Sequence, residues 1–266
     1  MTASRECASG RVGIDVPSVA RVYDYLLGGG HNFPADRALA ERISRLLPDV
    51  ELIASANRAF LRRAVLHMVG RGITQFLDLG SGIPTVGNVH EVARRAAPGA
   101  RVVYVDHDEV AVAHTELILD GDPDTAVVHA DICAPWRVLG SPEVVRLLDF
   151  RRPIGLLMVA VLHYVPDKRD PRSVVAAYRD AVPSGSALAI SHGTADHRPE
   201  ITAAAKILED SLDPAHPRPY DEIAALFTGF DVVPPGVVSA PLWRPDLRRY
   251  THNGPDDLYA GLGVKA

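Results

Sequence analysis

The chain has 266 residues, of which 47% are hydrophobic, and it carries a formal net charge of −5 at pH 7. This length and composition suit one α/β domain with a substantial core, and they exclude an intrinsically disordered chain. The mildly negative charge disfavours nucleic acid or an anionic membrane as a partner, since both attract basic proteins.

Two further features bear on the compartment. Cys7 and Cys133 are the two cysteines, too few for a disulfide framework or a thiolate zinc site. The first ten residues, MTASRECASG, lack the apolar core of a signal peptide, and no run approaches the roughly 18 apolar residues of a membrane span. We therefore expect a cytoplasmic protein.

The first part of the chain is expected to be helical. Residues 1–13 have no periodic pattern and are predicted to be a flexible tail. Apolar side chains recur at helical spacing over 18–27, 33–48 and 50–69, and in the first of these segments they form one stripe. That stripe consists of Val19, Val22, Tyr23, Leu26 and Leu27. Residues 14–71 are therefore predicted to form an N-terminal helical cap.

From Gly72 onward, strand and helix patterns alternate. Strands are expected at 73–80, 101–108, 125–132, 153–165 and 186–193, and helices at 87–97, 109–119, 173–182, 201–212 and 220–227. Two short strands are expected around Pro234, Pro235 and Gly236. The alternation predicts a Rossmann-like core over 72–266, with a mostly parallel sheet, helices on both faces and an antiparallel C-terminal edge.

A glycine turn follows the first strand in the stretch FLDLGSGIPT. Gly80 and Gly82 are present, but Thr85 replaces the third glycine of a dinucleotide-binding turn. Asp78 would repel a pyrophosphate there and attract a ligand that carries an ammonium and a sulfonium group. The pattern favours S-adenosylmethionine, with a purely structural glycine turn as the alternative.

Acids also follow the next two strands. Asp106 ends the second strand, where a carboxylate can accept hydrogen bonds from both ribose hydroxyls. Asp131 follows the third, where it can accept from the adenine amine while Ile132 packs on the ring. The alternatives are a surface-turn aspartate for Asp106 and a helix N-cap for Asp131. Together the acids predict an adenosyl pocket at the carboxyl edge of the sheet.

Several motifs resemble one family of S-adenosylmethionine-dependent methyltransferases, once catalogued as domain of unknown function 574. They include SVARVYDYLLGG, QFLDLGSGIPT, VVYVDHD, VLHYVPD and SHGTAD, and the similarity covers most of the chain. The resemblance implies a Rossmann-like class I methyltransferase fold with an N-terminal helical cap. It also implies that the cofactor contacts Gly80, Ser81, Gly82, Asp106, Asp131 and Ile132.

The chain departs from the family pattern at two places. It has Gly29-Gly30-His31-Asn32-Phe33 where members commonly read G-G-K-D-N-F, so this loop lacks the Lys and the Asp of the family pattern. It has Asp106-His107-Asp108-Glu109 where they read D-N-D-P, and this change keeps the first acid.

Methyl transfer needs alignment, exclusion of water and sometimes a base. His163 and Tyr164 follow the fourth strand and are the candidate catalytic residues, although His163 could instead be hydrogen-bonded to the neighbouring loop. His31 and His192 are candidate substrate contacts. The complete predicted cofactor set is Tyr25, Arg58, Asp78, Gly80, Ser81, Gly82, Pro84, Asp106, His107, Asp131, Ile132 and Val161.

The segment YDYLLGGGHNF is expected to act as a lid, with its three consecutive glycines as a hinge. Tyr23 and Tyr25 cannot share one helical face, and Tyr25 is the one predicted to reach the pocket. No metal is expected, because the spacing of His192, Asp196 and His197 is a weak ligand pattern.

The sequence therefore predicts a bacterial methyltransferase that uses S-adenosylmethionine and acts on an unidentified small-molecule acceptor. A non-catalytic S-adenosylmethionine sensor is the main alternative. An NAD(P)-dependent oxidoreductase is a weaker one, because the third glycine is missing. The pattern leaves the oligomeric state open.

Overall fold

The computed structural model describes residues 14–84, 87–245 and 256–266. The predicted tail and Thr85 lie outside these ranges. The strands are β1 (Gln75–Leu79), β2 (Arg101–Asp106), β3 (Thr125–His129), β4 (Gly155–Val159), β5 (Ala187–Gly193), β6 (Asp231–Val232), β7 (Val238–Ser239) and β8 (Leu258–Val264). They form one sheet in the order β3-β2-β1-β4-β5-β8-β6, with β7 also paired to β8.

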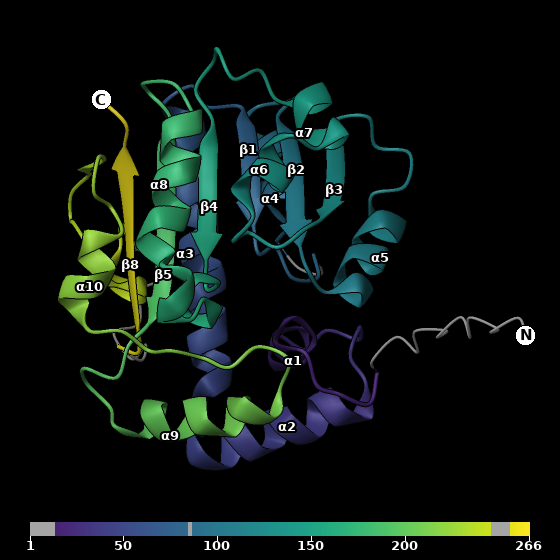
Figure 1. Ribbon diagram of the computed structural model, residues 1–266, viewed down its shortest axis with the longest axis vertical. Coiled ribbons are helices and arrows are strands. Elements are labelled where there is room, and N and C mark those ends of the chain that lie inside the picture. Colours follow the sequence, from purple (N-terminus) through teal and green to yellow (C-terminus); the bar gives the residue numbers. More distant parts are fainter. Residues whose placement is uncertain (1–13, 85–86, 246–255) are drawn as a thin grey trace, which may run out of the picture.

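The predicted mixed sheet is confirmed. Strands β1 to β5 run parallel, and β8 runs antiparallel to β5. In Figure 1 the arrowheads of β2, β3 and β4 point toward the lower helical layer, whereas β8 points away from it. Because parallel strands end at the same edge, the residues that follow β1, β2 and β4 meet there.

Strand β8 was not predicted from the sequence. Its segment LYAGLGV contains two glycines, which normally weaken a strand. A Cβ atom at Gly263 would lie 2.7 Å from Cβ of Phe230, and one at Gly261 would lie 3.0 Å from Cζ of Phe227. The glycines therefore let two phenylalanine rings pack directly on the strand. The predicted strands β6 and β7 exist, but each pairs with β8 rather than with the other.

The helices are α1 (Val19–Leu26), α2 (Pro34–Leu46), α3 (Val50–Gly70), α4 (Val89–Ala96), α5 (Glu109–Ile118), α6 (Pro135–Leu139), α7 (Pro142–Leu147), α8 (Pro171–Ala181), α9 (Glu200–Ile207) and α10 (Tyr220–Ala225). The short helices α6 and α7 were not predicted from the sequence. No helix in the described parts of the chain combines the length and apolarity needed to cross a bilayer.

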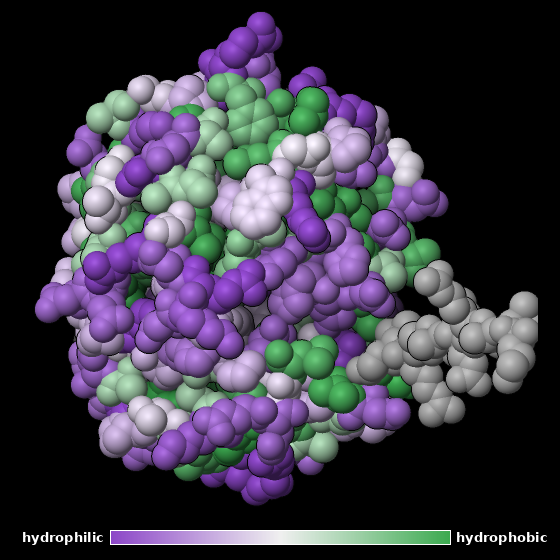
Figure 2. Space-filling model, viewed as in Figure 1, coloured by the Kyte–Doolittle hydropathy of each residue, from purple (hydrophilic) through white to green (hydrophobic). Residues whose placement is uncertain are grey.

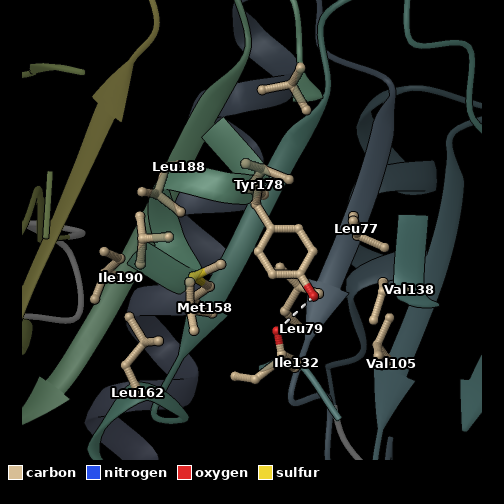
Figure 3. Close-up of a cluster of buried hydrophobic side chains, with 14 of the residues drawn as sticks. Leu77, Leu79, Val105, Ile132, Val138, Met158, Leu162, Tyr178, Leu188 and Ile190 are labelled. Atoms are coloured by element: carbon tan, nitrogen blue, oxygen red, sulfur yellow. Dashed lines mark hydrogen bonds between the residues drawn. The ribbon is translucent and has the colours of Figure 1, made fainter. Parts of the chain in front are cut away.

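Apolar side chains of the sheet fill a core on each of its faces. Leu77 and Leu79 of β1 belong to the cluster under α8, while Phe76 belongs to the cluster under α3. Figure 3 shows the first cluster, in which Tyr178 of α8 reaches across the sheet. This alternation is what a central strand covered on both faces requires.

A helical layer covers the carboxyl edge of the sheet. It consists of α1, α2, α9 and the first half of α3, and α9 joins it from late in the chain, packed against α2 (Figure 1). Its small core contains Val22, Leu39, Ile43 and Leu47, with Ala204 from α9. On the face of the molecule shown in Figure 2, mostly hydrophilic side chains cover the surface, with small apolar patches between them. We call this layer the cap.

The glycine-rich loop after α1 is built around the carboxylate of Asp24. Its Oδ2 accepts hydrogen bonds from the backbone N–H of His31 (2.8 Å) and from Nδ2 of Asn32 (2.9 Å). A Cβ atom at Gly29 would lie 1.9 Å from Oδ1 of Asp24, whereas one at Gly30 would meet nothing within 4 Å. Gly29 is therefore required by the close approach of Asp24.

The substitution Gly29→Ala is expected to push the Asp24 carboxylate away and to break both hydrogen bonds. The expected loss is about 3 kcal/mol in the free energy of unfolding, from steric overlap and a lost charged acceptor. Gly30→Ala is the matched control and should change stability by less than about 0.5 kcal/mol. Chemical denaturation of both variants measures the difference, and equal losses would contradict this account of the loop.

Candidate active site

A cavity lies where β1, β2 and β4 end beneath α1. We call it the strand-end cavity; its volume is about 90 Å³. Nine residues predicted from the sequence line it, namely Arg58, Asp78, Gly80, Ser81, Gly82, Asp106, His107, Val161 and Tyr164. Its other lining residues are Ser18, Val19, Ala20, Tyr23, Asn57, Leu61, Asp108, Val159, Ala160 and Asp213.

The glycine turn after β1 is hydrogen-bonded to the neighbouring strand β2. The backbone N–H groups of Gly80 and Ser81 both donate to the carbonyl of Val105, at 2.8 and 3.0 Å. Gly80 has φ +77°, and a Cβ atom there would lie 2.1 Å from Cγ2 of Val161. Gly82 also has a positive φ, +60°. A side chain at Gly80 would collide with Val161 and would need a strained backbone, so glycine is needed there.

Asp106 ties this turn to the end of β2. Its Oδ2 accepts the backbone N–H of Gly82 at 2.7 Å, and its Oδ1 accepts that of Asp108 at 3.0 Å. Asp108 in turn caps α5 by accepting from the N–H of Val110 at 2.8 Å. Burial raises the pKa of Asp106. Each carboxylate oxygen keeps lone-pair capacity for a further donor in the cavity.

Asp78 and Arg58 bring opposite charges to the strand-end cavity. Asp78 is buried and its carboxylate has no hydrogen-bond partner among the described residues, and burial raises its pKa to about 7 against the opposing effect of Arg58. Arg58 lies 5.7 Å from the ring centroid of Tyr23, and its buried Nε has no partner within the described chain. Both groups are therefore available to a charged ligand.

A second, apolar cavity lies within the cap. We call it the cap cavity; its volume is about 150 Å³. Aliphatic side chains of α1, α2, α3 and α9, and of the residues that directly follow α2 and α9, form much of its wall, among them Val22, Leu26, Ile43, Leu47, Val50, Ile53, Ile201 and Leu208. Polar groups line it as well, including Tyr23, Asn57, His163, Tyr164 and Asp257.

The two cavities adjoin. Five residues line both of them, and we call this shared boundary the neck: Val19, Tyr23, Asn57, Ala160 and Tyr164. A ligand in the strand-end cavity and another in the cap cavity would thus meet at the neck.

A chain of hydrogen bonds crosses the neck from the sheet to the cap. The N–H of Ala160 donates to Oγ of Ser191 (2.9 Å), which donates to Oδ1 of Asn57 (2.5 Å). Nδ2 of Asn57 donates to the hydroxyl of Tyr23 (2.9 Å), which donates to the carbonyl of Ala54 (3.0 Å). Each of these polar groups is satisfied, so the neck is held in one arrangement.

Sequence reasoning missed Asn57, Ser191 and Tyr23 as parts of the site. Asn57 sits inside an apolar helical stripe, which was the one available signal. Tyr23 belongs to the apolar stripe predicted for the first helix, and that face of α1 lines both cavities. Tyr25, the residue predicted to reach the pocket, instead packs against the core of the cap.

Four further predicted residues lie outside both cavities. The Asp131 side chain is 47% exposed and pairs with Arg169 at 2.8 Å. Figure 3 shows the side chain of Ile132 turned into the core, where its carbonyl accepts the Tyr178 hydroxyl at 2.9 Å. Pro84 is buried away from the cavity lining. Nδ1 of His31 lies 3.0 Å from Nδ1 of His114.

The structure also places His192 outside both cavities. It is fully buried; its Nδ1 lies 2.8 Å from the carbonyl of Gly193, and its Nε2 lies 3.0 Å from Nη1 of Arg218. Burial lowers its pKa to about 4. These contacts make His192 a neutral structural link, which leaves it no free nitrogen for a substrate.

The predicted catalytic pair does face the cavities. His163 lines the cap cavity, and Tyr164 lines both cavities at the neck. Burial lowers the pKa of His163 well below its usual value and raises that of Tyr164. At neutral pH the imidazole is therefore uncharged and the phenol protonated.

Comparison with known sequences decides the family. The sequence model of the family described as S-adenosyl methyltransferase matches residues 5–266. The chain belongs to this family. It is an S-adenosylmethionine-dependent methyltransferase, and S-adenosylmethionine is its cofactor. No curated protein matches its sequence.

Solved structures agree with this assignment. A DUF574 family protein from Streptomyces avermitilis is 36% identical with a TM-score of 0.92, covering 96% of this chain and 100% of that one. A candidate methyltransferase from Thermobifida fusca is 41% identical with a TM-score of 0.90, covering 98% and 99%. Human N-acetylserotonin methyltransferase, solved with the cofactor, is 16% identical with a TM-score of 0.50 over 92% of this chain and 62% of that one, and shares the fold.

The residues of the strand-end cavity fit S-adenosylmethionine. The carboxylate of Asp78, which accepts no hydrogen bond from the described residues, suits a cationic group, and the buried Nε of Arg58 suits a carboxylate. Both oxygens of Asp106 can accept further hydrogen bonds, as ribose hydroxyls require, and Gly80 leaves room for close approach. The cofactor supplies an electrophilic methyl group on a sulfonium, and the protein has to align and shield it.

The affinity for S-adenosylmethionine is expected to depend on pH through Asp78. Its pKa in the folded protein is about 7, above the usual 3.8, so this side chain favours folding most at low pH and the contribution is lost as the pH rises through 7. A cationic ligand favours the ionised form. Affinity should therefore fall about tenfold for each pH unit below 7 and level off above it.

Calorimetry at pH 6 in two buffers of different ionisation enthalpy should detect proton release on binding. The variant Asp78→Asn should bind more weakly at pH 8, release fewer protons and show a shallower dependence of affinity on pH. A wild-type affinity that is constant from pH 5.5 to 8 would refute the role of Asp78.

Proposed function

We propose that this methyltransferase methylates a small, largely apolar acceptor that binds in the cap cavity. This proposal rests on one observation: the strand-end cavity and the cap cavity adjoin at the neck. It lets an acceptor under the cap face a methyl group presented from the carboxyl edge of the sheet. The sequence-based expectation of a small-molecule acceptor is consistent with this arrangement.

The character of the cap cavity supports a small acceptor. A cavity of about 150 Å³ lined by aliphatic side chains is large enough for a group the size of benzene. Its position between α1, α2, α3 and α9 gives an apolar ligand a surface that excludes water. Exclusion of water also protects the electrophilic methyl group from side reactions.

The alternative function is that of a sensor, which binds S-adenosylmethionine without converting it. Formation of S-adenosylhomocysteine in the presence of a fraction of small bacterial metabolites distinguishes an enzyme from a sensor. The proposed enzyme turns over with this fraction, and a sensor does not. A macromolecular fraction that supports turnover where the small-molecule fraction does not would refute a small acceptor.

Two neighbouring residues of α9 allow a matched test of the cap cavity. Ala204 is buried and lines it, whereas Ala203 is exposed. Ala204→Phe is expected to fill the cavity and lower kcat/KM for the acceptor at least tenfold, while the affinity for S-adenosylmethionine stays within about twofold. Ala203→Phe should change neither. Unchanged turnover in a folded Ala204→Phe variant would place the acceptor elsewhere.

The location of the protein stays a prediction from its composition. We propose a bacterial cytoplasmic enzyme with a small-molecule acceptor and no nucleic-acid or membrane partner.

A further inference from the structure

His163 is fixed by backbone groups on two sides. Its Nδ1 accepts the backbone N–H of Gly193 at 3.3 Å, and its carbonyl accepts the N–H of His216 at 2.6 Å. Its ring packs against the ring of Tyr164, with centroids 4.3 Å apart, and lies 5.4 Å from that of His192. The imidazole is therefore held in one orientation at the wall of the cap cavity.

The Gly193 contact decides where the ring proton sits. A nitrogen that accepts an N–H needs its lone pair, so Nδ1 carries no proton. The single proton of the neutral ring is then on Nε2. No hydrogen bond to Nε2 occurs within 14–84, 87–245 and 256–266, and this atom is not among the fully buried polar atoms without a partner.

The surroundings keep the ring neutral. Burial is the main cause of its lowered pKa, and Arg218, His192 and His216 add to it. Arg218 is itself buried and bonded to the carbonyls of Leu162 and Val165, so it stays beside the ring. A cation next to the imidazole opposes a second proton on it.

We propose that Nε2–H of His163 is a hydrogen-bond donor that binds an oxygen of the methyl acceptor. The inference rests on the proposed function, since it places the acceptor in the cap cavity. It defines the acceptor class as a small apolar molecule that carries a carbonyl-type oxygen at the end facing His163.

This role replaces the general-base role suggested by the sequence. The lone pair of the imidazole is engaged by Gly193, and the nitrogen that remains already carries a proton. A donor lowers the nucleophilicity of the oxygen it binds. The oxygen held by His163 is therefore a recognition group, distinct from the atom that receives the methyl group.

Nitrogen-15 NMR of histidine-labelled protein tests the proton position without any acceptor. The resonances of His163 are assigned by their absence in His163→Phe and, independently, in His163→Gln. We expect a protonated Nε2, an unprotonated Nδ1 and no titration between pH 6 and 8. A proton on Nδ1, or titration in that range, would overturn the proposal whether or not turnover has been found.

Two ligands of matched shape test the recognition of oxygen. Acetophenone carries a carbonyl where ethylbenzene has a methylene group. In protein saturated with S-adenosylhomocysteine, acetophenone should bind about fivefold more tightly, the effect of one neutral hydrogen bond. His163→Phe should abolish this preference and His163→Gln should retain part of it. Equal wild-type affinities would refute the donor role, and failure of both ligands to bind would refute the cap cavity as the acceptor site.

Discussion

Replacement of Asp106 by alanine is expected to weaken the binding of S-adenosylmethionine about a hundredfold. The side chain holds the N–H groups of Gly82 and Asp108, and it has acceptor capacity left for the ribose hydroxyls. Hydrogen bonds to a charged acceptor contribute about 1.5–3 kcal/mol each, so losing the ribose contacts and the loop anchor should cost about 3 kcal/mol. Calorimetric titration with S-adenosylmethionine and S-adenosylhomocysteine measures the change.

Asp180→Ala is the matched control for this experiment. Asp180 is likewise an aspartate with a close polar partner, Arg179, but its side chain is 67% exposed and it does not line either cavity. Its replacement should leave both affinities unchanged. Wild-type affinity in a folded Asp106→Ala variant would mean that the ribose does not bind at the end of β2.

The part of the site that lies at strand ends could be predicted because short sequence patterns position it. Asp78, Gly80 and Gly82 lie within five consecutive residues, and Asp106 ends the next strand. A parallel sheet brings these ends together whatever the rest of the chain does. The structure places all four in the lining of one cavity.

The acceptor side could not be predicted in the same way, because it depends on contacts between distant segments. Asn57 and Ser191 are 134 positions apart and meet through one hydrogen bond. Ala204 reaches the cap only because α9 packs against α2. An apolar stripe such as that around Tyr23 has the same pattern whether it faces a packed core or a cavity.

Strand β8 illustrates a second limit of sequence reasoning. Its glycines lower its intrinsic strand propensity. They are needed because Phe227 and Phe230, which precede the strand by about 30 positions, pack directly on it. Packing thus overrides local preference at the sheet edge. The fold class could still be predicted because strands β1 to β5 each have a strong apolar pattern of their own.

Asp36→Asn is expected to loosen the cap through a buried ion pair. Asp36 is fully buried; it accepts Nε of Arg21 at 3.0 Å and the N–H groups of Ser18 and Phe33 at 3.0 and 2.8 Å. Arg21 is 1% exposed, and its Nη1 also lies 3.7 Å from Asp108 beside the strand-end cavity. A buried arginine whose main counter-charge is removed should destabilise the protein by about 3–5 kcal/mol, roughly 10 °C in Tm.

The cap offers an exposed counterpart to this pair. Arg42 of α2 and Asp210 lie 2.8 Å apart, but their side chains are 45% and 62% exposed. Because water screens such a pair, Asp210→Asn should change stability by less than about 0.5 kcal/mol. Thermal unfolding with and without S-adenosylhomocysteine compares the two variants. Asp36→Asn should also lower the affinity for S-adenosylhomocysteine, since Arg21 joins the cap to Asp108. A loss of stability without a loss of affinity would show that the cap folds independently of the cofactor site.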